Sequence, residues 1–285
     1  MKTTLIVNPY ASKVTPELAD RVARILGAPE TVFTERAGHA TELARDADAD
    51  VVVVFSGDGG FNEVLNGVRP ETVLGFVPGG GTSVLPRALG LPRDPVAAAG
   101  RIAAARTRRI ALGRANGRRF AFAAGIGLDA ELIRRVDALG RREDGRRPGD
   151  VAFARVALRT LAEHRVRFEP ALEVVGHGRA AFALVANADP YSYVGALPLR
   201  LPRGADLAGG LDLLAPRSFR ARSLPGAVSY LLTGHTRLPL LRLHDADRIE
   251  VRCDAPLPLQ LDGEDLGDIQ HVVLEAERDA VTVLV

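Results

Sequence analysis

A run of β-branched and aromatic residues over 51–55 continues directly into the turn Ser56-Gly57-Asp58-Gly59-Gly60 and then into a helix expected over 61–68. A continuous apolar run of this kind is typical of a parallel strand that is covered on both faces. Glycines at a strand-to-helix turn let backbone N–H groups approach a phosphate, and the helix N-terminus favours negative charge. Asp58 would repel a bare phosphate, so its position favours a Mg²⁺ ion, or a water bound to it, between carboxylate and phosphate. The alternative is a plain turn in which Asp58 is the helix N-cap.

Two further loops of similar chemistry follow strand signals in the same part of the chain. The sequence NPYASK at 8–13 offers an amide, a hydroxyl and a cation, and the sequence PGGGT at 78–82 offers three glycines and a hydroxyl. Strands that alternate with helices predict a doubly wound parallel sheet, and ligands of such sheets bind at the carboxyl ends of the strands. The three loops should therefore lie along one edge. The expected strands are 4–7, 31–34, 51–55 and 74–77, and the expected helices are 16–26, 39–47, 61–68 and further segments up to residue 105.

The pattern changes after about residue 112, where short strand signals separated by turns replace the alternation. Many short strands at turn spacing indicate a β-sandwich or a distorted barrel. We therefore expect an α/β fold with two parts: an N-terminal doubly wound α/β nucleotide-binding domain over 1–112, and a C-terminal β-rich sandwich or barrel domain over 113–285, whose last strand is able to return to the first domain. The expected strands are 120–124, 172–175, 181–186, 249–251, 257–261, 272–274 and 281–285, with helices over 151–163 and 223–233.

Composition removes several classes of protein. The single cysteine, Cys253, excludes an intramolecular disulfide framework and a Cys-rich zinc site. No window approaches the roughly 20 apolar residues of a membrane helix, so we expect a cytoplasmic protein. A net charge of +2 is too small to indicate a nucleic-acid partner. One basic segment is interpreted as a solvated exposed loop, or alternatively as a contact with anionic lipid headgroups: Arg134, Arg135, Arg141, Arg142, Arg146 and Arg147.

A set of motifs occurs in a fixed order along almost the whole chain. These motifs are NPYASK from Asn8, Thr34 with Gly38-His39-Ala40, SGDGGFNEVLNG from Ser56, GFVPGGGTSVLPRALGLP from Gly75, GIGLDAEL from Gly125, and LDGE from Leu261. In order and spacing the set resembles the diacylglycerol kinase catalytic-domain family, which includes bacterial lipid kinases and sphingosine and ceramide kinases. The resemblance implies an ATP- and Mg²⁺-dependent kinase that phosphorylates the hydroxyl of diacylglycerol or a related lipid, giving phosphatidic acid or its equivalent. Such an enzyme would work peripherally at the inner membrane surface, and a homodimer remains open.

The resemblance also implies roles for individual residues. Asp262 matches the proposed general base, Glu264 the neighbouring acidic position, and Asp58 and Asp129 the carboxylates around Mg²⁺. Taken alone, Asp262-Gly263 is typical of a surface hairpin turn, so its catalytic role comes from the resemblance. The positions that correspond to nucleotide contacts are Asn8, Ser12, Thr34, Gly57, Asp58, Gly59, Glu63, Gly80, Gly81 and Thr82.

Four residues depart from the family's usual motifs. Ser56 stands in place of a glycine and Gly60 in place of a threonine, while Ser83 and Val84 stand where an asparagine and an acidic residue are common. Gly60, Ser83 and Val84 favour a second interpretation, a non-catalytic nucleotide or lipid sensor, whereas a serine at position 56 also occurs in the sphingosine kinase branch. A third is an NAD kinase-like enzyme, whose related fold also carries a GGDG loop, although NEVLNG and LDGE argue against it. The acidic cluster tied to a second metal is reduced to Gly209-Gly210-Leu211-Asp212, so that metal is not expected.

Overall fold

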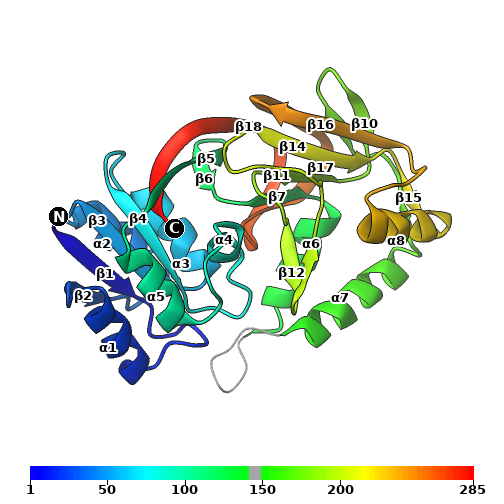
Figure 1. Cartoon of the computed structure of the whole chain (residues 1–285). Helices are drawn as coiled ribbons and strands as arrows, with labels where there is room; N and C mark the ends of the chain where they lie inside the picture. Colours follow the sequence, from blue (N-terminus) through cyan, green and yellow to red (C-terminus); the bar gives the residue numbers. More distant parts are fainter. Residues whose placement is uncertain (141–148) are drawn as a thin grey trace. The chain divides into compact units, whose positions relative to one another are not determined.

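The computed structural model describes residues 1–140 and 149–285, and the chain forms two compact units. Unit 1 consists of Met1–Leu112 with Arg278–Val285, and unit 2 of Gly113–Glu277. Two strands, β5 (Thr107–Ala115) and β18 (Glu264–Leu284), have residues in both units. Figure 1 shows the elements with the labels used here. The mixed α/β class expected from the sequence is confirmed, with a parallel sheet in unit 1 and antiparallel strands in unit 2.

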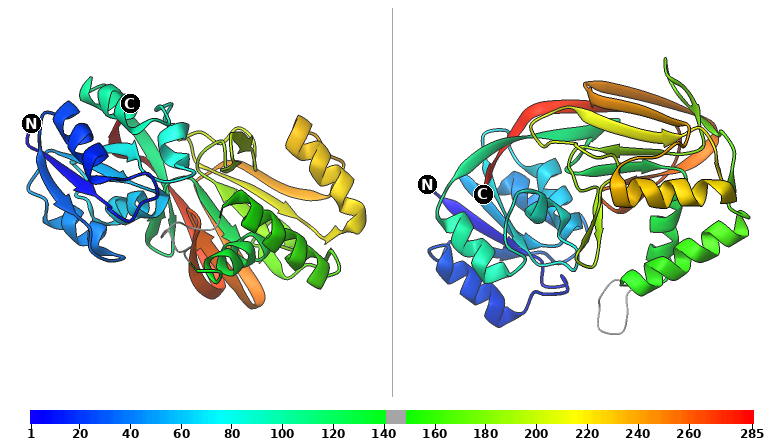
Figure 2. Two further views of the ribbon diagram at one scale, coloured as in Figure 1. Left: turned by 90° about the horizontal axis from the view of Figure 1, so that it is seen from below. Right: turned by 45° about the vertical axis from the view of Figure 1, so that its right-hand side comes forward.

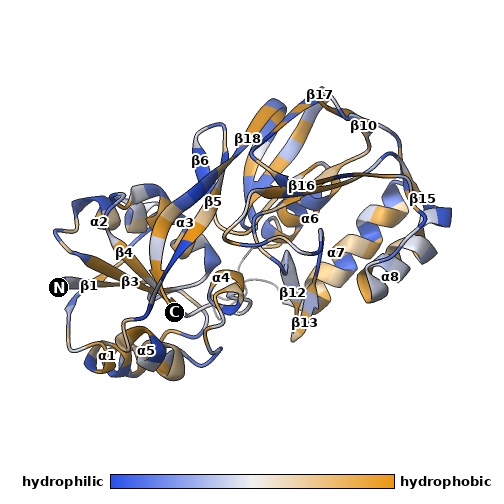
Figure 3. Ribbon diagram, turned by 45° about the horizontal axis from the view of Figure 1, so that its top comes forward, coloured by the Kyte–Doolittle hydropathy of each residue, from blue (hydrophilic) through white to orange (hydrophobic). Residues whose placement is uncertain are grey.

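Unit 1 is built on a parallel sheet in the order β2-β1-β3-β4, and the last residues of β18 extend it by pairing parallel to β4 (Thr282 opposite Val73). Helices α1 and α5 lie on one face and α2 and α3 on the other, as Figure 3 shows. The β3 side chains are buried throughout, which explains the uninterrupted apolar run. The strands are β1 (Thr3–Val7), β2 (Glu30–Phe33), β3 (Val51–Ser56) and β4 (Val73–Pro78); the helices are α1 (Pro16–Ile25), α2 (His39–Asp46), α3 (Asp58–Gly67), α4 (Val84–Ala88) and α5 (Pro95–Ala103).

Local chemistry sets where the helices of unit 1 begin and how closely they pack. The Thr15 hydroxyl accepts from Leu18 N–H at the start of α1, and Asp94 accepts from Ala97 N–H at the start of α5, with a proline next in each helix. Phe61 of α3 stacks edge-on against Phe76 of β4 at 5.2 Å. Burying such an aromatic ring stabilises the unit by about 1.5–3 kcal/mol. The contact between Phe61 and Phe76 holds the first turn of α3 against β4.

Unit 2 is an antiparallel sheet in the order β16-β14-β11-β7-β17-β18, with β9 and β10 beyond β17. Its core is built from alternate side chains of these strands, among them Leu172, Val185 and Leu213. Helices α6, α7 and α8 lie around this sheet (Figure 2). The strands are β6 (Arg118–Phe120), β7 (Ala123–Ile126), β8 (Arg167–Phe168), β9 (Leu172–Val174), β10 (Gly178–Ala180), β11 (Ala183–Ala186), β12 (Ser192–Val194), β13 (Leu197–Leu199), β14 (Leu211–Pro216), β15 (Phe219–Arg220), β16 (Leu240–Ala246) and β17 (Arg248–Leu261); the helices are α6 (Leu128–Asp137), α7 (Asp150–Glu163), the 3₁₀ turn η1 (Ala221–Ser223) and α8 (Leu224–Thr233).

Several boundaries differ from those expected. The predicted strands over 249–251 and 257–261 are one strand, β17, which stays paired through register shifts between Arg252 and Leu257. Such bulges break the alternation of side chains that sequence patterns rely on. Helix α3 begins at Asp58, three residues before the expected start, so Asp58 lies in the first turn and Gly57 is the N-cap. The strand at 107–115 was not predicted.

The basic segment is only partly within the described residues. Arg134 and Arg135 lie in α6 and pair with acidic side chains, Arg134 with Asp265 at 2.8 Å and Arg135 with Glu131 at 2.6 Å. They are therefore not part of an exposed loop, because the helix and its ion pairs hold them. Arg141, Arg142, Arg146 and Arg147 lie outside the described residues. In the part of the chain that the structure describes, no helix is long and apolar enough to cross a membrane.

Candidate functional site

The loops after β1, β3 and β4 contact one another through their backbones. Lys13 N–H donates to the Gly79 carbonyl (2.9 Å), and Gly79 N–H donates to the Ser56 carbonyl (2.6 Å). Because β1, β3 and β4 are parallel neighbours, their carboxyl ends meet at one edge of the sheet. The structure therefore brings the three loops together as the sequence predicts.

Two glycines, Gly57 and Gly80, allow the loops after β3 and β4 to approach each other closely. A Cβ on Gly80 would lie 2.9 Å from the Gly57 Cα, which is closer than side chains come to backbone atoms. By contrast, a Cβ on Gly81 would meet nothing within 4 Å, and both Gly81 and Thr82 are exposed. The Gly57–Gly80 contact joins the two loops, and the Gly81–Thr82 backbone remains open to a ligand. Backbone N–H groups beside the N-terminus of α3 form a suitable place for a phosphate.

Ser56 and Gly60 fit each other inside the same turn. Ser56 is 1% exposed, and a Cβ at position 60 would overlap its hydroxyl. The two departures from the family's usual motif are therefore coupled, since a larger residue at 60 would require a smaller one at 56. Ser83 is similarly accommodated: it adopts the left-handed conformation (φ 49°), which asparagine also tolerates, and its hydroxyl donates to the Gly80 carbonyl (3.2 Å). Val84 is 2% exposed and packs in the core.

Two acidic residues of α3 have different environments. The Asp58 carboxylate accepts a long bond from Leu85 N–H (3.4 Å), at the junction with the loop after β4. The Glu63 carboxylate accepts from Gly38 N–H (2.9 Å) and Ala40 N–H (3.1 Å), at the start of α2. Glu63 therefore ties α2 to α3, and we describe it as a residue that positions the Gly38 turn. Asp58 is the acidic side chain of α3 that lies at the edge where the three loops meet.

The remaining predicted residues of unit 1 also lie at the carboxyl ends of strands. Asn8 follows β1, and its side-chain oxygen accepts from Tyr10 N–H (2.9 Å) in a turn that leads to Ser12. Thr34 follows β2 and is 6% exposed, and its N–H donates to the Val7 carbonyl (2.9 Å). All ten residues that the resemblance matches to nucleotide contacts therefore lie in unit 1.

The sequence offers Lys13 as a cation for this edge, and the structure places the charges of Arg87 and Arg93 near it. Burial lowers the pKa of Lys13, and the positive charges of Arg93 and Arg87 lower it further. A pKa lowered by neighbouring cations means that positive charge is gathered near the three loops. Such a concentration of charge favours a polyanion such as a nucleoside triphosphate. The spacing of Lys13, Arg87 and Arg93 along the chain gives no signal of this concentration of positive charge.

In unit 2, Asp262 is a buried, hydrogen-bonded residue in the turn of a hairpin. Asp262 and Gly263 have positive φ (50° and 81°) and join β17 to β18, as the turn prediction requires. The turn does not have the surface position that is typical of an Asp-Gly pair, because Asp262 is 4% exposed. Its carboxylate accepts from three successive N–H groups, Ala121 (2.7 Å), Phe122 (2.9 Å) and Ala123 (3.1 Å). Pairing of β17 with β7 brings the turn against this segment, and the donor set matches an ionised carboxylate.

Asp129 belongs to a second buried polar cluster of unit 2. Its Oδ2 accepts from the Tyr191 hydroxyl (2.7 Å) and from Gln260 Nε2 (2.7 Å), and a Cβ on Gly125 would overlap this carboxylate. Burial raises the pKa of Asp129, while the hydrogen bonds from Tyr191 and Gln260 act in the opposite direction. Burial and the Asp129 charge also raise the pKa of Tyr191. Sequence reasoning missed Tyr191 and Gln260, although Gln260 lies two residues before Asp262.

The raised pKa of Asp129 leads to a prediction about stability and pH. A carboxyl group with a raised pKa binds its proton more tightly in the folded chain, so its contribution to stability is full below about pH 3.9 and is lost as pH rises through the folded pKa. Asp129→Asn removes that loss. We expect the free energy of unfolding of this variant, relative to wild type, to increase from pH 4.5 to pH 7.5, measured by urea denaturation at both values. A difference that is constant or decreases with pH would contradict the assignment.

Glu264 and the predicted metal residues complete the site residues. Glu264 forms an ion pair with Arg118 (2.8 Å) and is half-buried. Among residues 1–140 and 149–285, no three His, Cys, Asp or Glu side chains are grouped so as to hold a metal by themselves. Mg²⁺ commonly takes one or two carboxylates and completes its shell with water and substrate phosphate, so Asp58, beside the edge where the three loops meet, has the chemistry to hold such an ion. Asp129 offers a carboxylate in unit 2.

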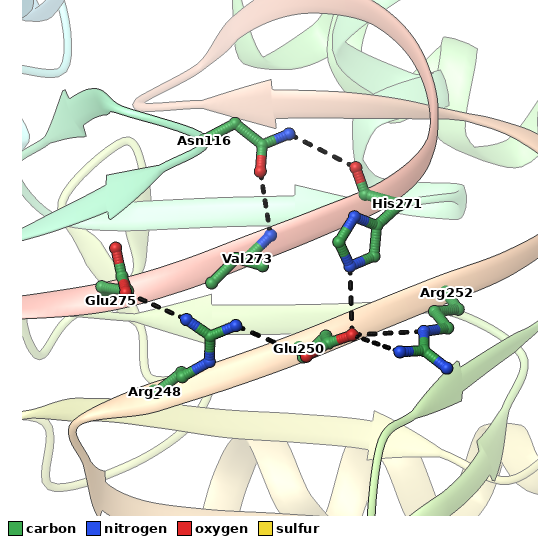
Figure 4. Close-up of polar contacts among 7 residues, drawn as sticks. All are labelled: Asn116, Arg248, Glu250, Arg252, His271, Val273 and Glu275. Carbon is green, nitrogen blue, oxygen red and sulfur yellow. Dashed lines mark hydrogen bonds and ion pairs between the residues drawn. The ribbon is translucent and has the colours of Figure 1, made fainter.

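A shallow depression of about 510 Å³ occurs elsewhere on unit 2, lined by Glu250, Arg252, Cys253, Gln270 and His271. Figure 4 shows its polar contacts: Glu250 accepts from Arg252 (2.8 Å), and His271 Nε2 lies 3.1 Å from the same oxygen. Arg252 and His271 are more than half exposed, and such ion pairs contribute little stability. These are not residues that the sequence singles out, so the depression is separate from the predicted site.

Comparison with known proteins agrees with this geometry. Residues 2–115 match the model of the diacylglycerol kinase catalytic domain. A diacylglycerol kinase of Bacillus subtilis is 39% identical over 109 residues, which is 36% of each chain. The matches span 36% to 58% of the length of the first curated relatives.

Solved structures show the same fold over nearly the whole chain. A crystal structure of a diacylglycerol kinase from Bacillus anthracis superimposes with a TM-score of 0.72 at 20% identity, covering 99% of this chain and 96% of the other. An NAD kinase from Archaeoglobus fulgidus in complex with ATP superimposes with a TM-score of 0.51 at 12% identity, covering 99% and 93%. The chain therefore has the fold of these structures, and its residues 2–115 match the model of the diacylglycerol kinase catalytic domain.

Proposed function

We propose that this protein is a Mg²⁺-dependent kinase that transfers the γ-phosphate of ATP to the hydroxyl of diacylglycerol or a related lipid, giving phosphatidic acid or its equivalent. The observation that carries the proposal is the convergence of three loops at one sheet edge, joined by the Gly57–Gly80 approach and by the Gly79 hydrogen bonds. That edge has the backbone donors, the helix N-terminus and the nearby cations that a triphosphate needs. The family match supports a lipid acceptor.

The candidate site residues of unit 1 have separate roles in this mechanism. The exposed Gly81–Thr82 backbone and the turn at 57–60 bind and orient the phosphates, while Lys13 supplies positive charge to their oxygens. Asp58 would hold the metal ion, which neutralises charge on the transferring phosphoryl group. Asn8, Ser12 and Thr34 lie along the same edge and would contact the rest of the nucleotide. Phosphoryl transfer depends mostly on positioning and electrostatic stabilisation, and this edge provides for both.

Unit 2 would supply the group that receives the acceptor's proton. We assign this role to Asp262, whose carboxylate is held in one orientation by the N–H groups of Ala121, Phe122 and Ala123. A general base contributes to rate by being placed within hydrogen-bond distance of the proton that it takes. Glu264 lies two residues further along the same hairpin, and its ion pair with Arg118 fixes it there. Asp129 is a second candidate for the carboxylates around the metal ion.

Two other functions are alternatives to the proposed lipid kinase. An NAD kinase-like activity is favoured by the shared fold at a TM-score of 0.51, against 0.72 for the diacylglycerol kinase structure. A sensor without catalysis is favoured by the departures at 60, 83 and 84, but each of these residues fits its local structure. Ser56 fits Gly60, Ser83 adopts the left-handed conformation, and Val84 is buried.

The test is transfer of labelled γ-phosphate from Mg-ATP into mixed micelles that contain diacylglycerol, a sphingoid base, ceramide or phosphatidylglycerol, with NAD as a separate acceptor. We expect label in one lipid, and a fall of about a hundred-fold in Asp58→Asn, because loss of one charged ligand weakens stabilisation of the transition state. Glu71→Gln, a change of an exposed acidic residue outside the three loops, is the matched control and should retain activity. Label in NAD would favour the NAD kinase-like function. ATP binding without label in any acceptor would favour a sensor and overturn the proposal.

A further inference from the structure

Helix α8 of unit 2 has an exposed apolar surface that the proposed catalytic roles leave unused. Its ten residues, LPGAVSYLLT, include no charged side chain. Surface helices of globular proteins usually carry charged or polar residues on the face that meets water. On α8 the outward side chains are instead Leu224, Val228, Leu231 and Leu232, which are 38%, 52%, 40% and 76% exposed.

The opposite face of α8 holds the helix on unit 2. Tyr230 is 6% exposed, and the guanidinium of Arg242 lies 5.4 Å from the centre of its ring. A Cβ on Gly226 would lie 2.9 Å from Leu238 Cγ, so this side of the helix packs closely against the segment that follows it. Figure 1 shows α8 at the periphery of the unit, near β15, and both views of Figure 2 also show this helix at the periphery. Residues 224, 228 and 231 follow helical spacing, so the four apolar side chains form one stripe.

The charged residues of the chain segment that contains this stripe are of one sign. Residues 213–244 contain five arginines and no aspartate or glutamate, although the average composition of the chain would place about four acidic residues in a segment of this length. Arg220 pairs with Glu169 of a distant segment (3.0 Å). Arg222 and Arg237 are exposed, one before and one after the helix. An apolar stripe between basic residues is the pattern of a helix that lies in the interface of an anionic membrane.

We propose that the stripe formed by Leu224, Val228, Leu231 and Leu232 inserts into the surface of an anionic phospholipid bilayer, with Arg222 and Arg237 contacting the headgroups. The proposal rests on the proposed function, since a lipid acceptor requires contact with a membrane. A second copy of the chain fits this face less well, because it would bring the same arginines of both copies together. An anionic bilayer matches both features, because its acyl chains accept the apolar stripe and its headgroups attract the basic flanks.

The chain contains no tryptophan, which makes a direct test available. Leu232→Trp places a single fluorophore in the stripe, and Leu158→Trp places one on α7, where Leu158 is 69% exposed. With vesicles of phosphatidylcholine and phosphatidylglycerol, we expect a blue shift and quenching by brominated lipid for Leu232→Trp only. Equal shifts in both variants, or no shift in Leu232→Trp, would overturn the proposal. A blue shift that grows with protein concentration in the absence of lipid would assign the face to a second copy instead.

Charge is tested separately from apolar contact. Arg222→Gln and Arg237→Gln should each weaken vesicle binding roughly five-fold, and the effect should vanish with vesicles of phosphatidylcholine alone. Kinase activity in mixed micelles is measured beside binding, and neither arginine belongs to the proposed catalytic residues. Kinase activity in mixed micelles, without a vesicle-dependent blue shift of the Leu232→Trp fluorescence, would contradict the membrane-docking proposal but not the proposed kinase function. A blue shift of the Leu232→Trp fluorescence with vesicles, without phosphoryl transfer to any lipid, would contradict the proposed kinase function and support the membrane-docking proposal.

Discussion

Replacing Asp262 by Asn should reduce phosphoryl transfer to lipid by about a thousand-fold and should also destabilise unit 2. The loss of activity follows from the proposed role of the carboxylate as general base. The loss of stability follows from the structure, in which Ala121, Phe122 and Ala123 all point N–H donors at the two carboxylate oxygens. Asn presents one oxygen and one NH₂ group, so an N–H donor would face another donor.

The expected destabilisation is about 3 kcal/mol, because buried hydrogen bonds to a charged group are lost and one donor is left unpaired. Urea denaturation measures it, and ATP binding measured by calorimetry shows whether unit 1 remains intact. Asp254→Asn is the matched control: Asp254 lies outside the candidate site and pairs with Arg179 at the surface, so its change should cost no more than about 0.5 kcal/mol. A folded, ATP-binding Asp262→Asn with normal phosphoryl transfer would remove Asp262 from the mechanism.

Gly80→Ala should weaken ATP binding strongly and lower the stability of unit 1 by about 1–3 kcal/mol. The new Cβ would lie 2.9 Å from the Gly57 Cα, which is a backbone atom, so the two loops must separate. Moving either loop displaces the N–H groups that we assign to the phosphates. A thermal melt and ATP titration of the same sample measure both effects.

The neighbouring glycine provides the comparison. A Cβ on Gly81 would meet nothing within 4 Å, so Gly81→Ala should keep the stability of wild type within about 0.5 kcal/mol. If the triphosphate packs against the Gly81–Thr82 backbone, the same change should still weaken ATP binding. Retention of full ATP affinity by both variants would place the nucleotide elsewhere.

Parts of the site were predictable because they depend on local sequence. The turn at 56–60 follows an apolar strand, and parallel neighbours end at the same edge, so the meeting of three loops follows from the alternation of strands and helices. Asp262-Gly263 as a hairpin turn is local in the same sense. By contrast, the burial of Asp262 depends on β7, about 140 residues earlier in the chain, and no local pattern reports that pairing.

Other features could be seen only in three dimensions. Ser56 and Gly60 look like two separate departures from the family's motifs, but the structure shows that one hydroxyl occupies the space that a side chain at 60 would need. The carboxylate of Asp129 depends on Tyr191 and Gln260, which lie 62 and 131 residues away. Long strands such as β17 escaped prediction because bulges interrupt the alternation of their side chains.

The amino-acid sequence by itself determined the α/β class of the fold, the glycine-rich turns and the order of the family's motifs, because strand and turn propensities act over a few residues. Only the tertiary structure decided which backbone atoms touch, where the buried carboxylates find their donors, and that residues 278–285 join unit 1. The physical reason is that these outcomes depend on strand pairing and close packing between distant segments, such as Thr282 opposite Val73. The apolar stripe of α8 belongs to both levels: its composition is visible in the sequence, and its exposure is visible only in the fold.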